Sequence, residues 1–162
     1  MLPNGNLKLI DRKKDLVKLQ GGEYVSLNKV ESIIKLLSYI DNCCLVADSY
    51  KSNCVLLACA NVKRIKDYIK EENDENVENP DKLTSEQVFD YLEKNTKLVQ
   101  KLTKEMEDHC RQHGLERFEI PTRISFVRES WVPDSGLVTD SLKLKRKEIE
   151  NFYKKNIETL YK

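Results

Sequence analysis

Glycine and proline are scarce in this chain, which contains only five glycines and four prolines among its 162 residues. Together these two residue types supply about 12% of an average protein, and the chain falls well below that share. Because glycine and proline build most tight turns, few such turns can be formed here. This shortage favours long helices and disfavours a many-turned β-sandwich or β-propeller.

The charge balance of the chain is almost even, with 28 lysines and arginines against 27 aspartates and glutamates. A general nucleic-acid-binding protein is strongly basic, so we predict no nucleic-acid partner. Hydrophobic residues make up 40% of the chain and charged residues 34%, which is typical of a folded domain with a charged surface. No apolar run reaches the roughly 18 residues that a membrane-spanning helix needs. The N-terminus does not resemble a secretory signal peptide.

The five cysteines are odd in number and form no Cys-x-x-Cys pair. Four of them lie in apolar, strand-like segments, where cysteine packs as a small hydrophobic residue. We therefore expect free thiols and no disulfide framework. The cysteines are Cys43, Cys44, Cys54, Cys59 and Cys110.

Hydrophobic periodicity predicts the order of helices and strands along the chain. Strands are expected at 7–10, 16–19, 24–27, 43–47, 54–60 and 124–127. Helices are expected at 28–40, 62–70, 84–113 with a joint near Asn95, and 147–161. We expect strands 43–47 and 54–60 to pair antiparallel across the polar turn 48–53. The pattern predicts a small two-layer α+β domain, with an N-terminal β-hairpin region and a short, mainly antiparallel sheet packed with helices.

Two segments do not fit an ordinary element. Asn4-Gly5 is a strong hairpin turn signal, but a turn at that point leaves no room for a complete first strand. We expect the chain to be part of a longer protein, with 7–10 as the surviving second strand. Residues 71–81 carry acidic side chains and no basic ones, which predicts a solvated loop or a short disordered insert.

A first candidate site lies in residues 10–25, where a dense charge cluster runs into the paired glycines Gly21 and Gly22. Glycine lets a backbone approach a ligand closely, and the nearby arginine and lysines favour an anionic ligand. An ordinary basic hairpin explains the same pattern.

A second candidate site lies in residues 136–146, where a polar loop presents Lys143 between two leucines. Lysine is a compact, mobile charge that can meet a phosphate or carboxylate oxygen as negative charge develops there. A solvated loop followed by a helix start is the alternative interpretation.

Taken together, these segments resemble the long-chain acyl-CoA synthetases. Residues 7–14 look like the end of the fatty-acyl-CoA synthetase signature, and residues 20–31 are similar to the segment that follows it. Residues 136–139 followed by 143–146 resemble the closing lysine motif of the family, and residues 151–161 fit its C-terminus. The resemblance covers nearly the whole chain and is weakest at 71–81.

The resemblance implies a place in the adenylate-forming superfamily, whose members have a large N-terminal domain and a small mobile C-terminal lid. Residues 1–14 would be the tail of the adenylation domain and the hinge, and residues 15–162 the lid. The implied enzyme joins a fatty acid to CoA, using ATP and Mg²⁺ bound mainly by the N-terminal adenylation domain. That domain would be the partner of this chain, and the isolated chain is expected to be inactive.

The resemblance also assigns roles to residues. Lys143 aligns with the lysine of the adenylation step, Arg12 with the arginine that contacts the ribose, and Lys14 with the hinge. The resemblance further implies a face that serves thioester formation with CoA, which consists of Lys18, Gly21, Gly22, Glu23 and Tyr24.

The chain departs from the family pattern near the closing lysine. Many relatives carry glycine just before that lysine, where this chain has Leu142. Lys145 lies two residues further on and is a weaker candidate for the same role. The turn at Gly21 and Gly22 is one residue longer than in luciferase-like relatives, which favours the long-chain subfamily.

Other residues carry weaker signals. His109 and His113 have a spacing that can hold a metal, but no second ligand pair accompanies them, so we predict no metal site. Trp131 is expected to anchor its loop to the core. The basic run 143–147 can meet an anionic membrane surface, and the implied substrate is a lipid. The resemblance implies a position on the cytoplasmic side, with membrane association through the part of the enzyme outside this chain.

Two further functions stay open at this point. The chain could belong to an adenylate-forming ligase for another carboxylate, because an acyl tunnel would lie outside it. It could also be a separate anion-binding or interaction module.

Overall fold

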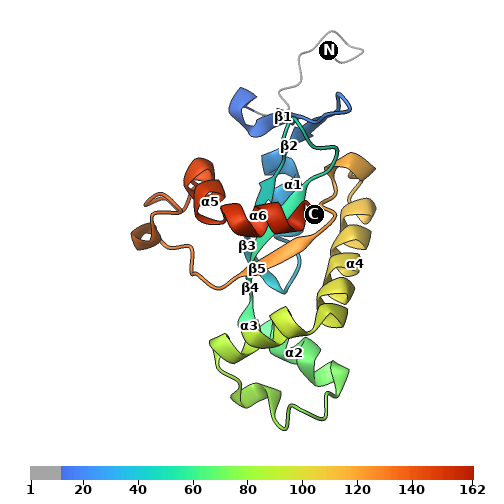
Figure 1. Ribbon diagram of the computed structural model, residues 1–162, viewed down its shortest axis with the longest axis vertical. Coiled ribbons are helices and arrows are strands. Elements are labelled where there is room, and N and C mark those ends of the chain that lie inside the picture. Colours follow the sequence, from blue (N-terminus) through green and yellow to red (C-terminus); the bar gives the residue numbers. More distant parts are fainter. Residues whose placement is uncertain (1–11) are drawn as a thin grey trace.

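The computed structural model describes residues 12–162, so the expected turn at Asn4-Gly5 and strand at 7–10 lie outside the described residues. The described part begins with a 3₁₀ turn η1 (Lys13–Asp15), which leads directly into a β-hairpin. The hairpin strands β1 (Leu16–Lys18) and β2 (Tyr24–Ser26) pair antiparallel, as predicted. The hairpin lies at the top of the molecule in Figure 1.

A three-stranded sheet forms the centre of the domain, in the order β3-β4-β5. Its strands are β3 (Ile40–Val46), β4 (Val55–Ala60) and β5 (Ile124–Val127). The predicted antiparallel pairing of β3 with β4 is confirmed, and Cys44 faces Leu57 in that register. Strand β5 joins the other side of β4 in parallel. The sheet is therefore mixed, with β4 in the middle and β3 and β5 at its edges.

The central sheet is buried on both faces where residues 43–46 of β3 pair with β4, because both stretches are apolar without polar alternation. Cys43 and Leu45 face one hydrophobic cluster, whereas Cys44 and Val46 face another. The first cluster includes side chains of α1 (Leu27–Ile34) and of the other helices on its side of the sheet. The predicted α+β class is confirmed. Helices cover both faces of the sheet, so the domain has three layers where we expected two.

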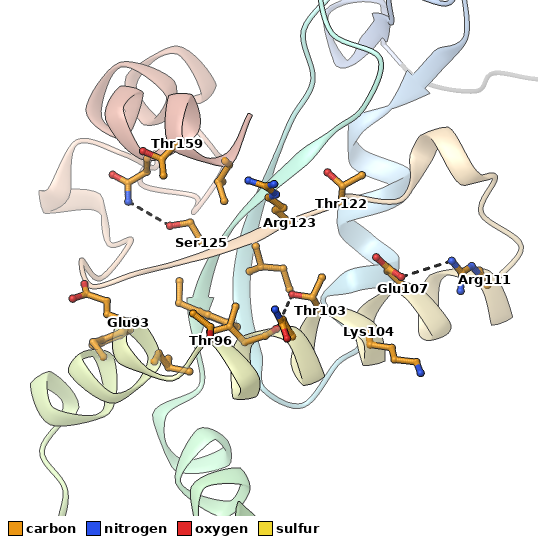
Figure 2. A pocket seen from close by; sticks show the side chains of 18 residues that line it. Glu93, Thr96, Thr103, Lys104, Glu107, Arg111, Thr122, Arg123, Ser125 and Thr159 are labelled. Atoms are coloured by element: carbon orange, nitrogen blue, oxygen red, sulfur yellow. Dashed lines mark hydrogen bonds and ion pairs between the residues drawn. The ribbon is translucent and has the colours of Figure 1, made fainter. Parts of the chain in front are cut away.

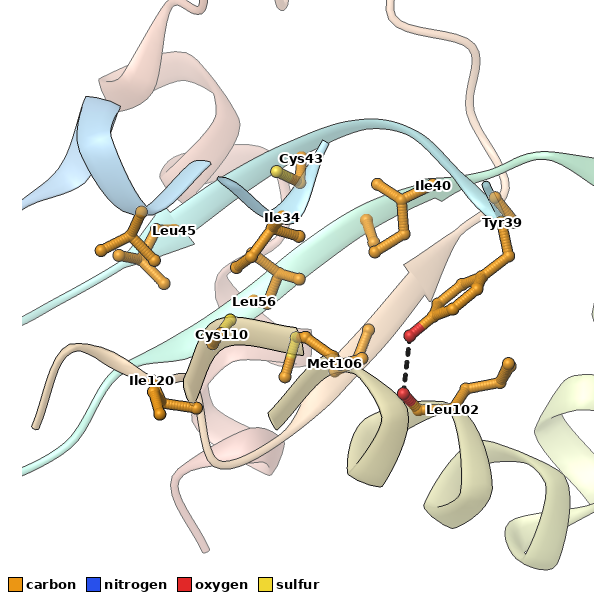
Figure 3. Packing of buried hydrophobic residues seen from close by; sticks show 14 of the residues in the cluster. Ile34, Tyr39, Ile40, Cys43, Leu45, Leu56, Leu102, Met106, Cys110 and Ile120 are labelled. Atoms are coloured by element: carbon orange, nitrogen blue, oxygen red, sulfur yellow. Dashed lines mark hydrogen bonds between the residues drawn. The ribbon is translucent and has the colours of Figure 1, made fainter. Parts of the chain in front are cut away.

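The larger cluster is packed by long helices, as the shortage of turn residues predicts. Its helices besides α1 are α2 (Val62–Glu72), α3 (Ser85–Lys94) and α4 (Thr96–Gln112). The buried Tyr39 hydroxyl donates a hydrogen bond to the carbonyl oxygen of Leu102 at 2.6 Å, which ties the start of β3 to α4. Figure 3 shows this contact among the packed aliphatic side chains.

The smaller cluster lies under the C-terminal helices α5 (Arg146–Phe152) and α6 (Lys154–Leu160). Trp131 is buried there, as expected, and its Nε1 donates to the Tyr153 hydroxyl at 3.1 Å. That hydroxyl donates in turn to a carboxylate oxygen of Glu129 at 2.8 Å. Tyr153 thereby fixes the loop after β5 against the helix pair.

Helix boundaries are confirmed where a side chain caps the helix. Thr84 and Gln87 form a capping box at the start of α3, where the predicted helix begins. The joint near Asn95 is a real break, since the Asn95 side chain accepts from Leu98 N–H and begins α4. Gly114 adopts a left-handed backbone conformation just beyond α4, as a helix stop requires.

Two helix predictions are wrong in part. The helix expected at 28–40 ends at Ile34, and Ile40 already begins β3. The apolar residues past the helix end do not extend its buried face. Tyr39 packs against α4, and Leu36 is 66% exposed in the turn. The single helix expected at 147–161 is broken at Tyr153, and Phe152, expected to face inward, is 58% exposed.

The acidic segment 71–81 begins in the last turn of α2 and continues as a loop to a short 3₁₀ turn, η2 (Pro80–Lys82). The Tyr91 hydroxyl donates to Asp74 at 3.1 Å, and Lys70 forms an ion pair with Asp81 at 2.6 Å. Val77 packs partly against the larger cluster. The segment is thus a solvated loop with defined anchors and no disordered insert.

The five cysteines are free, as predicted. Cys59 is partly exposed and the other four are buried. Burial raises the pKa of Cys44, Cys54 and Cys59 to about 12, because a thiolate loses its hydration there. These thiols therefore act as packing groups at neutral pH.

Candidate functional site at the hinge and the lysine loop

Arg12, Lys14 and Lys143 line one hollow of about 440 Å³, although the chain separates the first two from the third by more than a hundred residues. The hollow lies between η1, helix α1 and the loop that precedes α5. The other lining residues are Asp15, Asn28, Glu31, Lys35, Leu142, Leu144 and Arg146. Five cationic and two anionic side chains contribute, so the hollow attracts anions.

Lys143 stands on a small hairpin, which we call the lysine loop and define as residues 137–145. Val138 and Leu144 form an antiparallel bridge at its base. Across the loop, Thr139 N–H donates to the Lys143 carbonyl at 2.8 Å, and Lys143 N–H donates to the Thr139 hydroxyl at 3.0 Å. The backbone of Lys143 is thus held on both sides while its side chain is exposed.

Leu142 has a left-handed backbone conformation, with φ of 64°. Its N–H donates to the Thr139 carbonyl at 2.8 Å, which closes the tip of the lysine loop. A side chain with a Cβ is strained in this region, and glycine is not. The departure of this chain from the glycine of many relatives therefore falls on a position where the backbone itself favours glycine.

A buried ion cluster closes the floor of the hollow. The guanidinium of Arg146 donates Nη1 to Glu31 Oε1 at 2.6 Å and Nη2 to Glu31 Oε2 at 2.9 Å. Its Nε donates to Asp15 at 3.4 Å. Glu31 also accepts Leu45 N–H at 2.8 Å, which joins the cluster to strand β3. Arg146 is therefore turned inward, and our expectation that it forms part of an exposed basic run is wrong.

Sequence reasoning missed Asp15 and Glu31 as members of this site. Both carboxylates are buried, at 8% and 3% exposure. The available signal is the position of Glu31, which lies beside Val30 and near Ile34 on the apolar side of α1. A buried carboxylate needs a partner, but the sequence does not say that the partner is Arg146.

The residues predicted to serve thioester formation lie on the β1–β2 hairpin and do not line the hollow. Leu19 N–H donates to the Glu23 carbonyl at 2.8 Å, which leaves a three-residue loop closed by Gly22 at φ of 94°. Lys18 Nζ lies 5.9 Å from the ring centroid of Tyr24, and that ring is 60% exposed. Gly21 and Gly22 are both exposed at the turn.

Other candidates lie away from this hollow. Lys145 is exposed and does not line it. The ring of His109 is bonded to the Ile33 carbonyl at 2.8 Å, and the ring of His113 to the His109 carbonyl at 2.8 Å. Within residues 12–162, no group of three histidine, cysteine or acidic side chains is placed to hold a metal ion. Nor is any helix in that range long and apolar enough to cross a membrane.

A groove of about 940 Å³, about twice the volume of the hollow, runs along β5 between α4 and α6 (Figure 2). Its charged lining is mixed in sign, with Glu93, Glu107, Arg111 and Arg123 among the side chains drawn. None of the predicted site residues contributes to it. Size alone therefore does not identify the site.

The fold matches solved adenylation domains. The adenylation domain of a carboxylate reductase from Mycobacterium chelonae superposes with a TM-score of 0.73 at 19% sequence identity, over 94% of this chain and 20% of that one. The corresponding domain from Segniliparus rugosus, solved with AMP and a carboxylic acid, gives a TM-score of 0.71 at 19% identity, over 94% and 20% of the two chains. The fold is that of one segment of an adenylation domain.

Sequence comparison gives more closely related proteins than the fold comparison does. Long chain acyl-CoA synthetase 8 of Arabidopsis thaliana is 36% identical over 159 residues, which is 98% of this chain and 21% of that protein. Long-chain-fatty-acid–CoA ligase 4 of Saccharomyces cerevisiae is 35% identical over 160 residues, or 99% and 22%. No protein-family model matches the chain. The chain is homologous to a segment of the long-chain acyl-CoA synthetases and spans about one fifth of their length.

The strained backbone of Leu142 makes an unusual prediction for a leucine-to-glycine change. Leu142→Gly removes a left-handed non-glycine residue that is already 61% exposed, so we expect the free energy of unfolding to rise by about 0.5 kcal/mol. Urea unfolding of the chain measures this. The matched control is Leu144→Gly, which removes a half-buried side chain and is expected to cost about 2 kcal/mol. A larger loss at Leu142 than at Leu144 would contradict the assignment of strain.

Proposed function

We propose that this chain is the C-terminal lid segment of a long-chain fatty-acid–CoA ligase that forms AMP from ATP. The observation that carries the proposal is its similarity to long-chain acyl-CoA synthetases over almost its whole length. The meeting of Arg12, Lys14 and Lys143 at one anion-attracting hollow supports it.

In the first proposed step, a fatty-acid carboxylate attacks the α-phosphorus of ATP, and pyrophosphate leaves. Negative charge builds up on the oxygens of the reacting phosphate and carboxylate. Lys143 is exposed on a loop whose backbone is hydrogen-bonded on both sides, so its ammonium group can be offered to those oxygens without loop rearrangement. Arg12, on the same hollow, would contact the ribose.

In the second proposed step, the thiol of CoA attacks the acyl carbonyl and AMP leaves. The β1–β2 hairpin would face the site during this step, with Lys18 and the turn Gly21, Gly22, Glu23 and Tyr24 toward CoA. Gly22 is exposed and has no neighbouring atom within 4 Å of where a Cβ would stand, so the turn offers its backbone to a ligand there. The lid would alternate between its two faces by rotation at Lys14, which lies in η1 immediately before the hairpin.

The remainder of the enzyme is the proposed partner of this segment. We place the ATP and its Mg²⁺ mainly on that part. The alternative that the enzyme activates a different carboxylate is tested by the full-length enzyme with a series of acyl chain lengths. A preference for long chains supports the proposal, whereas activity confined to short or aromatic acids contradicts it.

The first test of the adenylation role is Lys143→Ala in the full-length enzyme. We expect acyl-AMP formation to fall by about 10²-fold or more, because a charge contact made in the transition state is lost. Thioester formation from supplied acyl-AMP should be largely retained. Pyrophosphate release and single-turnover thioester formation measure the two steps separately.

Lys145→Ala is the matched control, since Lys145 is equally exposed but does not line the hollow. A loss of adenylation in Lys145→Ala and not in Lys143→Ala would show that the closing motif is misassigned. The isolated chain serves as a second control and should release no pyrophosphate from ATP and palmitate.

The hinge is tested by Lys14→Pro. Proline fixes φ and removes the backbone donor, so rotation at this exposed position should be restricted. We expect acyl-AMP to form at near the normal rate while transfer to CoA slows by about 10-fold or more. Equal loss of both steps would argue against a hinge at Lys14.

We also propose that the enzyme lies on the cytoplasmic side of a membrane and contacts it through regions outside this chain. In the described segment Lys145 and Lys147 remain exposed, but Arg146 is engaged with Glu31, so the basic surface is small. Sedimentation with phosphatidylserine vesicles should recover the full-length enzyme and leave the 162-residue chain in the supernatant. Equal binding of both would place the contact in this segment.

A further inference from the structure

Arg146 joins parts of the domain that are far apart in the sequence. It contacts residues of three other elements: Asp15 in η1, Asn28 and Glu31 in α1, and Cys44 in β3. Its side chain is 18% exposed, and those of Asp15 and Glu31 are 11% and 4% exposed. The contacts span sequence separations of 102 to 131 residues.

The geometry uses most of the donor capacity of one guanidinium. Both Nη atoms form a bidentate pair with Glu31, and Nε is aimed at Asp15, which gives a planar fork with fixed directions. Burial lowers the pKa of Arg146, but the hydrogen bonds and charge of Glu31 outweigh burial and raise it overall. Lysine has one charged centre and cannot occupy both carboxylates in this way.

The cluster joins groups that are close in the sequence to two of the predicted functional residues, Lys143 and Lys14. Arg146 follows Lys143 by three residues, and Asp15 follows Lys14 by one. Arg146, which directly follows the lysine loop, thus reaches η1 through Asp15 and is held by a buried anchor, Glu31. Glu31 is itself fixed to the sheet by Leu45 N–H.

We propose that Arg146 is a positioning residue that locks the lysine loop to the hinge segment. It binds Asp15 and Glu31 at once, so that Lys143 moves as one rigid unit with Asp15, the residue just after the hinge. This inference rests on the proposed function, since it explains how a rotation at the hinge presents Lys143 in a fixed geometry. Displacement of a reacting group by about 1 Å can cost about 10²-fold in rate, so such a lock has kinetic consequences.

The rigidity of the unit can be measured without any enzymatic activity. In Arg146→Lys we expect amide hydrogen exchange to accelerate by about 10-fold at Thr139, Lys143 and Asp15, whose N–H groups bond within the lysine loop and η1. Exchange in strand β4 should stay unchanged, which shows that the domain remains folded.

Arg128→Lys is the matched control. Arg128 binds three carboxylates, with Glu86 and Asp90 at 2.8 Å and Glu93 at 2.9 Å, but it does not line the hollow. Its replacement should leave exchange in the lysine loop and η1 unaltered. Asp15→Asn is a milder second variant, because it removes the carboxylate at the hinge and keeps the Arg146–Glu31 pair.

The kinetic test uses the full-length enzyme with both half-reactions. Arg146→Lys should lower kcat for acyl-AMP formation by about 10-fold or more, leave KM for ATP within about 2-fold, and largely spare thioester formation from supplied acyl-AMP. Asp15→Asn should show the same pattern with a smaller effect.

Two results would overturn the lock. One is unchanged exchange at the lysine loop and η1 in Arg146→Lys; the other is an equal loss of both half-reactions, which indicates a purely structural role. If the wild-type enzyme forms no acyl-AMP while exchange responds as expected, the proposed function fails and the lock remains.

Discussion

The pairing of β3 with β4 is the contact on which the rest of the domain depends. Its register sends alternate side chains to opposite faces, so Leu45 and Val46 enter different hydrophobic clusters. The same strand gives the N–H of Leu45 to Glu31, and Glu31 holds Arg146. A chain of contacts therefore runs from the edge strand β3 to the start of α5, next to the lysine loop, whose tip is exposed.

Most of the fold could be predicted because the signals are local. Capping by Thr84 and Asn95, the glycine stop after α4 and the apolar strand runs each depend on residues close together in the sequence. The errors arise where tertiary packing decides. Helix α1 ends at Ile34, although apolar residues continue beyond it. Tyr39 packs against α4, and such a tertiary contact leaves no periodic pattern in the sequence.

Some residues of the candidate site could likewise be predicted from the sequence, and others could not. The resemblance singled out Arg12, Lys14 and Lys143 as residues with a role, and the structure brings these three side chains to one hollow. The assigned roles themselves remain predictions. Asp15 and Glu31 were not predicted, because their importance comes from one arginine more than a hundred positions away. Single buried charges in a sequence indicate that a partner exists, but only the fold shows which one.

The break between α5 and α6 has a practical consequence. Tyr153, at that break, holds the indole of Trp131, which is the only tryptophan of the chain. The indole is 8% exposed and lies in the cluster beneath the two C-terminal helices. Its fluorescence spectrum is therefore a built-in optical reporter of how those helices seat on the sheet, and a red shift would mark their release before the larger core on the opposite face opens.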